Sequence, residues 1–390
     1  MDPTPAAMHL DTFDFDAFLR ESWQKQPLLI RNPWNSWRNP LEPDELAGLA
    51  CEPEVESRLV TQASNSWELE HGPLAESRFG KLGKAPWTLL VQAVDHHVPA
   101  VAALLEPFRF IPNWRIDDVM VSYAVEGGGV GPHFDQYDVF LVQGLGRRRW
   151  QLGGLCDEAT ELLPHDDLRL LASFEPTAEW VLEPGDILYV PPRFAHNGVA
   201  ASDDCMTYSI GFRAPSRREL IASWCERLLA DLEDDDRYAD PDLAAQANPG
   251  EISPRAIDRL HGMIAERMHD REAFADWFAR YATAPKNPEI DWRPEAPVDA
   301  GEVRRLLADR VPLLRNPAGR FSFIREGAAR LALFVDGERF ACAGEAAAFA
   351  ERICAKGRVV ASPDTAASKP AIELITRLLD QGSVAFDLTD

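Results

Sequence analysis

Three side chains in this sequence have the types and the spacing of a metal site. His133 and Asp135 form a His-x-Asp pair, and because side chains alternate along a strand, both would point to the same face. His196 offers a third ligand at the end of the segment GDILYVPPRFAHNGV, after an apolar run and two prolines. Two histidines and one carboxylate leave three positions open on an octahedral metal, as in non-haem Fe(II) oxygenases. Zinc would favour a tetrahedral site with fewer open positions.

A bare His-x-Asp pair is a weak signal, and the chain contains a second one for comparison. His165 and Asp167 lie in LLPHDDLRL, a polar stretch without a strand pattern, so they are predicted to be surface residues. Glycines precede His133, and an apolar strand follows Asp135. The adjacent pair at positions 96 and 97 is also predicted to lie on a helix surface and not to bind metal.

Three consecutive arginines follow the first His-x-Asp pair in a chain whose formal net charge is -23. If RRRWQL is a strand, Arg148 shares its inner face with Trp150 and Leu152, while Arg147 and Arg149 face solvent or a partner. A buried guanidinium is costly unless it is paired. Its partner is either an acid elsewhere in the chain or the far carboxylate of a keto acid such as 2-oxoglutarate. The nearby metal ligands favour the keto acid.

The elements that must position these groups form a block of short strands. Residues 119–212 contain segments rich in β-branched and aromatic residues, punctuated by Gly and Pro, which is typical of an antiparallel sandwich or barrel. Before this block, residues 15–32 predict an amphipathic helix followed by a short strand. Residues 87–108 carry apolar residues at three- and four-residue steps and predict another helix.

The chain becomes helical again after Pro215. One helix has a single apolar stripe, and Ser253-Pro254 predicts the N-cap and first residue of a second amphipathic helix. These helices would pack on the barrel or form a subunit interface, and periodicity does not separate the two. The Pro-rich residues 284–297 suggest a linker. The remainder mixes helices with strands, has Asp336-Gly337 as a hairpin turn, and is long enough for a small α+β domain.

Composition restricts the class of protein. The chain has 390 residues, so we expect two or three domains. No apolar run reaches the length of a membrane-spanning helix, and the first residues lack the apolar core of a secretory signal. Six scattered cysteines without CxxC spacing fit a reducing cytoplasm. The net charge of -23 argues against nucleic-acid binding and suits either a basic partner or simple solubility.

Several long motifs together carry a family resemblance. FLRESWQKQPLLIRN, DDVMVSYAVEGGGVGPHFDQYDVFLVQGLGRRRWQLG, PGDILYVPPRFAHNGVA and CMTYSIGFRAP resemble the JmjC-type ribosomal oxygenases of the cupin superfamily. More narrowly, they are similar to the bacterial arginine hydroxylases that modify large-subunit ribosomal protein 16. The resemblance is dense up to residue 215 and looser beyond it.

The resemblance implies a mixed α+β fold in three parts. These are a double-stranded β-helix (cupin or jelly-roll) oxygenase barrel in residues 1–214, a helical dimerisation region in 215–290 and a winged-helix-like domain in 291–390. It therefore implies a homodimer as well. Because the chain is acidic, we expect the winged domain to be structural or protein-binding and not to bind DNA.

The resemblance also implies the site residues and the reaction. Carried over by position, the iron ligands are His133, Asp135 and His196, and Arg148 and Ser122 hold the distal carboxylate of 2-oxoglutarate. The expected substrate mouth contains Asp118, Met120 and Tyr137. Fe(II), 2-oxoglutarate and O2 would then hydroxylate an arginine of the basic ribosomal protein. Two alternatives stay open: a related oxygenase acting on a histidine or methyl-lysine, and a non-catalytic cupin-like scaffold that binds its partner through the winged domain.

Overall fold

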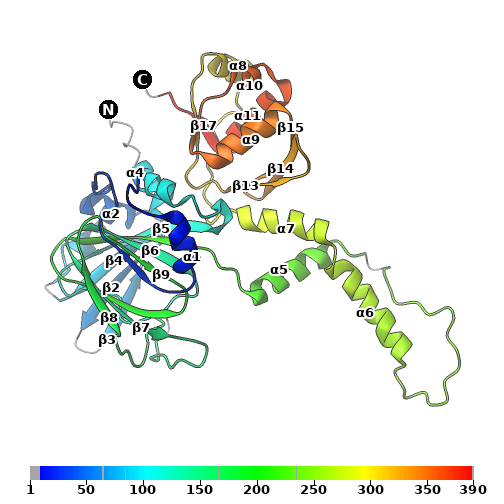
Figure 1. The fold of residues 1–390 in the computed structure, drawn as a ribbon, viewed down its shortest axis with the longest axis horizontal. Coiled ribbons are helices and arrows are strands. Elements are labelled where there is room, and N and C mark those ends of the chain that lie inside the picture. The colour runs from blue at the N-terminus through cyan, green and yellow to red at the C-terminus, as the bar shows by residue number, and fades with distance from the viewer. Residues whose placement is uncertain (1–8, 64–65, 84, 166, 234, 389–390) are drawn as a thin grey trace.

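Two antiparallel sheets face each other in the first half of the chain and form a barrel (Figure 1). The computed structural model describes residues 9–63, 66–83, 85–165, 167–233 and 235–388, so the first eight residues lie outside it. The larger sheet has eight strands in the order β1-β9-β6-β11-β5-β4-β2-β3. Their bounds are Leu28–Ile30 (β1), Ser57–Ala63 (β2), Ser66–His71 (β3), Trp87–Val91 (β4), Ile116–Ala124 (β5), Asp138–Leu145 (β6), Ile187–Val190 (β9) and Cys205–Phe212 (β11).

The smaller sheet covers the open face of the larger one. It has the order β10-β7-β8, with bounds Phe194–Ala200, Arg148–Leu155 and Ala178–Leu182. Apolar side chains from both sheets fill the space between them: Val139, Leu141, Trp150, Leu152, Leu182, Leu188 and Val190. The mixed α+β fold with a cupin-type barrel, which the family resemblance implied, is confirmed.

The outer face of the larger sheet packs against the N-terminal helices. Val119 and Val121 of β5 join this outer core, together with Phe18 of α1 (Phe15–Glu21) and Leu46 of α2 (Pro43–Leu49). The even-numbered residues of β5 therefore point into the barrel, because successive side chains alternate. A short helix α3 (Glu76–Phe79) and a 3-10 turn η3 (Asn113–Arg115) complete this half.

The helix predicted for residues 87–108 is wrong. This segment is strand β4, the 3-10 helix η1 (Val94–His96), the short helix α4 (Pro99–Ala102) and the 3-10 helix η2 (Ala103–Phe108). A strand buried on both faces gives a continuous apolar run that periodicity cannot distinguish from a buried helix. The prolines at 99 and 107 also mark breaks in the helical pattern.

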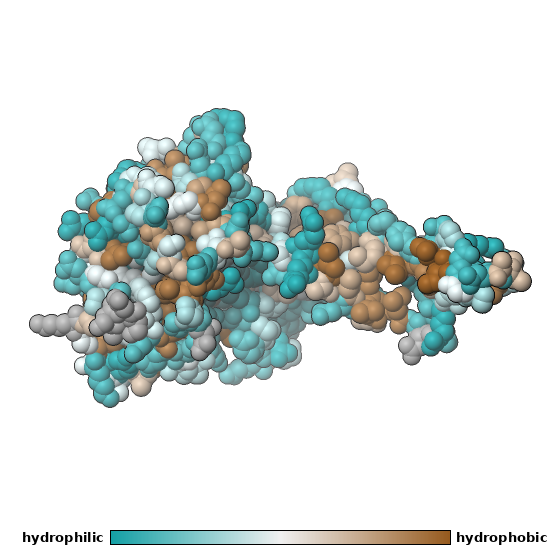
Figure 2. All heavy atoms as spheres, turned by 90° about the horizontal axis from the view of Figure 1, so that it is seen from below, coloured by the Kyte–Doolittle hydropathy of each residue, from teal (hydrophilic) through white to brown (hydrophobic). Residues whose placement is uncertain are grey.

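Three helices then extend from the barrel as an arm (Figure 1): α5 (Arg217–Ala230), α6 (Pro254–Met268) and α7 (Arg271–Thr283). The predicted cap of α6 is confirmed, since Ser253 accepts a hydrogen bond from the backbone of Ala256 and Pro254 is the first helical residue. Helix α6 buries none of its side chains. Apolar residues gather along the arm (Figure 2). The exposed apolar side chains of α5 and α6 include Leu229, Ile257, Leu260 and Ile264.

The C-terminal part has a core of its own and lies against the barrel (Figure 1). Residues 284–297 are irregular, as expected of a linker. The elements that follow are α8 (Ala300–Ala308), β12 (Leu313–Arg315), β13 (Phe321–Arg325), β14 (Arg330–Val335), β15 (Glu338–Ala343), α9 (Glu345–Ala355), β16 (Arg358–Val359), α10 (Pro363–Ala367), α11 (Lys369–Asp380) and β17 (Val384–Phe386). The hairpin turn predicted at Asp336-Gly337 is confirmed between β14 and β15. Across the described part of the chain, no helix has the length and apolar character needed to cross a membrane.

Candidate metal and cosubstrate site

His133, Asp135 and His196 come together inside the barrel. One ligand atom from each lies within 4.8 Å of the others. Backbone pairing produces this, because His133 and His196 form an isolated antiparallel bridge. The amide of His133 donates to the carbonyl of His196 at 3.0 Å, and the reverse bond is 2.8 Å. The carbonyl of Asp135 accepts from the amide of Arg193 at 2.6 Å, which fixes the carboxylate beside the histidines.

The orientation of both imidazoles suits metal binding. Nδ1 of His133 lies 2.9 Å from the carbonyl of Gly131, and Nδ1 of His196 lies 2.9 Å from that of Phe194. A carbonyl only accepts, so each Nδ1 carries the hydrogen and each Nε2 keeps a free lone pair. Burial, reinforced by His133, lowers the pKa of His196 to about 4, so this ring is neutral at neutral pH. These donors fit a divalent transition metal.

Arg148 is buried without a carboxylate. The residue is 3% exposed, and its Nε and Nη2 have no hydrogen-bond partner. No ion pair reaches Arg148 from any described residue. The strand pattern is as predicted, since Arg148, Trp150 and Leu152 are buried while Arg149 is exposed. Unpaired buried donors of this kind call for an anionic ligand, and a keto-acid carboxylate fits them.

Ser122 lies in a polar cluster that the sequence reasoning found only in part. Its hydroxyl is 3.4 Å from the carbonyl of Thr207, its partner across the β5–β11 ladder. The Thr207 hydroxyl donates to Gln143 Oε1 at 3.1 Å. Both residues are buried on the inner face and were missed. The alternation in MTYSIGF points Thr207 inward, but its neighbours depend on a register that no local pattern contains.

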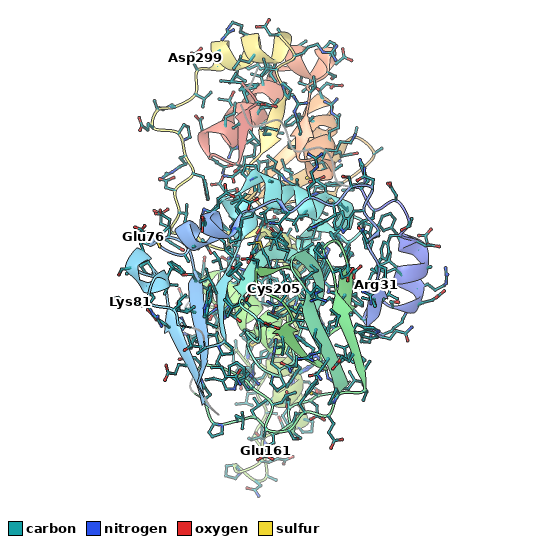
Figure 3. The ribbon with its side chains drawn as sticks, turned by 90° about the vertical axis from the view of Figure 1, so that its left-hand side faces the viewer. Arg31, Glu76, Lys81, Glu161, Cys205 and Asp299 are labelled. Atoms are coloured by element: carbon teal, nitrogen blue, oxygen red, sulfur yellow. The ribbon has the colours of Figure 1, made fainter. Side chains whose placement is uncertain are left out.

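The two ends of β5 lie beside different parts of the site. Ala124 packs with Ala200, the cross-strand neighbour of Arg148, and with Cys205, which Figure 3 labels in the middle of the barrel. At the other end lies Asp118, whose charge and that of Asp135 both act on the Tyr137 hydroxyl. Asp118 therefore lies on the Asp135 side of the site. The Arg148 guanidinium lies 5.8 Å from the centre of the Trp150 ring, which is itself 5.9 Å from the His196 ring.

The residues predicted for the substrate mouth surround the Asp135 side of the barrel. The residue Tyr137 is 43% exposed, but its hydroxyl turns inward to Asp135; burial, Asp135 and Asp118 raise the pKa of this hydroxyl. The sulfur of Met120 accepts from Arg58 Nη2 at 3.8 Å. Asp118 is 3% exposed and already has a cation, because Lys286 Nζ lies 2.7 Å from its Oδ2.

The other histidines do not join the site. His165 has other partners: its Nδ1 accepts from the amides of Asp167 and Leu168, and its Nε2 lies 3.3 Å from the carbonyl of Trp67. The surface position predicted for His96 is wrong, since this residue is 7% exposed and burial lowers its pKa to about 4. It belongs to the short 3-10 helix η1 and not to a long surface helix.

Comparisons with known proteins agree with this geometry. The Escherichia coli (strain K12) ribosomal protein uL16 3-hydroxylase is 43% identical over 305 residues, which cover 78% of this chain and 80% of that protein. A probable ribosomal oxygenase of Haemophilus influenzae is 39% identical over 311 residues, 75% of this chain and 74% of that protein. The X-ray structure of E. coli ycfD matches with a TM-score of 0.89 at 36% identity, over 98% of this chain and 100% of that one. The structure of YcfD in complex with cobalt and 2-oxoglutarate matches at 0.85 and 36% identity, over 97% and 99%.

A β-barrel that gathers two histidines, a carboxylate and an unpaired arginine in its interior defines the class of non-haem, 2-oxoglutarate-dependent oxygenases. The family model of the JmjC domain matches residues 103–220, and that of the ROXA-like winged helix matches residues 266–385. With a relative at 43% identity over most of both chains, this chain belongs to the JmjC-type ribosomal oxygenases.

Proposed function

We propose that this protein is an Fe(II)- and 2-oxoglutarate-dependent oxygenase that hydroxylates an arginine side chain of ribosomal protein uL16. The observation that carries the proposal is the pairing of a His-Asp-His cluster with a buried guanidinium that lacks a partner in its own chain. The relative that acts on uL16, and the similar structure that contains cobalt and 2-oxoglutarate, support it.

Each site residue has one task in this proposal. Nε2 of His133, Nε2 of His196 and a carboxylate oxygen of Asp135 hold the metal. Arg148, aided by Ser122, binds the distal carboxylate of 2-oxoglutarate and so sets how deep the keto acid enters. With O2, the bound iron and keto acid supply the oxidising power for hydroxylation, and the keto acid leaves as succinate and CO2. The apolar walls exclude water from the reacting groups.

Asp118, Met120 and Tyr137 form the substrate mouth in this proposal. A carboxylate and an aromatic ring suit a guanidinium guest through ion pairing and stacking. The acid at this position favours arginine over the neutral histidine ring of the first alternative. The scaffold alternative gives no role to an intact metal cluster beside an unpaired arginine.

The wider organisation is also a proposal. We infer an oxygenase domain in residues 1–214, a dimerisation region in 215–290 and a winged-helix-like domain in 291–390. The exposed apolar faces of the arm support a homodimer. The six free cysteines support a cytoplasmic location. The acidic net charge supports steering of a basic ribosomal protein and argues against DNA binding by the winged domain.

Mass spectrometry tests the reaction. Purified uL16 is incubated with this protein, Fe(II), 2-oxoglutarate and O2, and its peptides are then fragmented. Addition of one oxygen atom to an arginine supports the proposal. Oxidation confined to a histidine, or loss of a methyl group from a lysine, would favour the alternative oxygenase. An unchanged substrate together with undiminished uL16 binding would favour the scaffold.

A further inference from the structure

Two cations from the C-terminal half reach the start of strand β5. Lys286 lies in the irregular segment after α7, and its Nζ is 3.0 Å from Asp117 Oδ2 and 2.7 Å from Asp118 Oδ2. Arg320 Nη2, next to β13, is 2.7 Å from Asp117 Oδ1. The Asp118 side chain is only 4% exposed. The linker and the C-terminal domain are thus joined by ion pairs to the strand that carries Asp118 and Met120.

The two oxygens of Asp118 have different surroundings. Oδ2 accepts from Lys286 and also from Gln92 Nε2 at 2.8 Å. No hydrogen bond or ion pair from a described residue reaches Oδ1. This oxygen faces Gly211 of β11, where an added Cβ would lie 3.9 Å away. Because Gly211 has no side chain, a cation that enters the barrel can meet Oδ1.

Acid groups crowd this end of the barrel. Burial and the charge of Asp117 raise the pKa of Asp118, and the charge of Lys286 acts in the opposite direction. Asp95 is 2% exposed and accepts from the amide of Val119 at 2.8 Å, and burial together with the charge of Asp118 raises its pKa to about 8. Burial lowers the pKa of Lys286, but the charges of Asp118 and Asp117 outweigh burial and hold this pKa above its ordinary value. Without this ammonium, neighbouring carboxylates in a dry site repel one another and take up protons.

We propose that Lys286 is a positioning residue of the substrate mouth. It binds Oδ2 of Asp118, so that the carboxylate stays ionised and its Oδ1 stays open to the substrate guanidinium. The inference rests on the proposed function, since it takes an arginine side chain as the guest. It makes the linker before the C-terminal domain part of substrate recognition. A purely structural ion pair would add little net stability, because burying two charges costs about as much as their attraction returns.

The test compares full-length variants in steady-state hydroxylation of an arginine-containing uL16 peptide. Lys286→Met keeps the volume and removes the charge, Lys286→Arg keeps the charge, and Lys356→Met removes an exposed lysine as a control. We expect Lys286→Met to raise KM for the peptide about tenfold, equivalent to one lost contact of modest strength, with kcat within about twofold. The Kd for 2-oxoglutarate, measured without peptide, should be unchanged, and the arginine variant should restore KM.

Other outcomes overturn the inference. An unchanged KM in an active Lys286→Met enzyme overturns the inference about Lys286 and leaves the proposed function standing. A parallel loss of peptide and 2-oxoglutarate binding does the same. A wild-type chain that hydroxylates no arginine overturns the proposed function as well. If Lys286→Met fails to fold, Gln92→Leu removes the other donor to Oδ2. The same rise in KM is then expected, and an unchanged KM in that variant is equally decisive.

Discussion

His133 and His196 exchange two backbone hydrogen bonds, although 62 residues lie between them in the chain. This short bridge joins the loop after β5 to strand β10 and fixes both imidazoles before any metal arrives. Preformed ligands lose little conformational freedom on binding, so the bridge favours metal affinity.

The metal cluster predicts a sharp contrast between the two His-x-Asp pairs. Asp135→Ala removes a ligand, so we expect turnover to fall at least about 100-fold and metal affinity to weaken with it. Asp167→Ala removes an exposed acid of the other pair and should leave both unchanged. Metal titration and succinate formation measure the two effects. Similar losses in both variants would contradict the assigned ligand set.

Arg148→Ala should weaken 2-oxoglutarate binding by about 100-fold, because a charge-assisted bidentate contact contributes a few kcal/mol. Iron binding should change much less. Arg149→Ala is the matched control, since this neighbour on the same strand is exposed. Equal losses of keto acid and metal in Arg148→Ala would mean that the arginine supports the barrel and does not bind the cosubstrate.

Gly211→Val should close the space in front of Asp118 Oδ1. We expect KM for the arginine peptide to rise about tenfold or more while the Kd for 2-oxoglutarate stays the same. Gly154→Val is the control, because a Cβ at this exposed position meets nothing within 4 Å. If Gly211→Val hydroxylated the peptide with normal KM, the substrate would have to enter elsewhere.

Asp95 predicts a pH effect on stability. Burial, and then the charge of Asp118, raise the pKa of Asp95 from 3.8 to about 8 in the folded protein. The folded chain therefore holds this proton where the unfolded chain has lost it, and the free energy of unfolding falls as pH rises from about 4 to 8. The drop is on the order of a few kcal/mol. Asp95→Asn still accepts a hydrogen bond from Val119 but does not titrate, so its free energy of unfolding should not show this drop. Urea unfolding at pH 5 and pH 8 measures it, and equal pH slopes for both proteins would refute it.

The arm predicts the oligomeric state. Leu260→Glu together with Ile264→Glu places two charges on the exposed apolar face of α6, so the proposed homodimer should dissociate to a monomer. Light scattering after size-exclusion chromatography measures the mass. Leu155→Glu on the barrel is equally non-conservative at a 63% exposed position and should have no effect. A wild-type monomer would refute the dimer directly.

The sequence predicted the parts of the site that local patterns contain. Strand alternation placed Arg148 inward, and the strand-end histidine placed His196 opposite His133. The contributions of Thr207 and Lys286 depend on strand register and on the docking of the C-terminal domain. Such long-range pairings leave no trace in hydrophobic periodicity.

The misassigned segment 87–108 has the same cause. An apolar run in β4 has no period of its own, and only its neighbours β2 and β5 decide that it is a strand. His96 was predicted to lie on the surface because a helix was expected around it. The structure has only a short 3-10 helix there. The burial of this histidine follows from tertiary packing, which local sequence does not contain.

Helix α6 leaves every one of its 15 residues outside the core of its own chain. A segment of this length has little stability in water by itself. In the proposed homodimer its order would come from the partner subunit, and mass action would link that order to the amount of protein present. Dilution should therefore loosen the arm at temperatures that leave the barrel intact, giving a first unfolding step that moves with concentration and a second that does not.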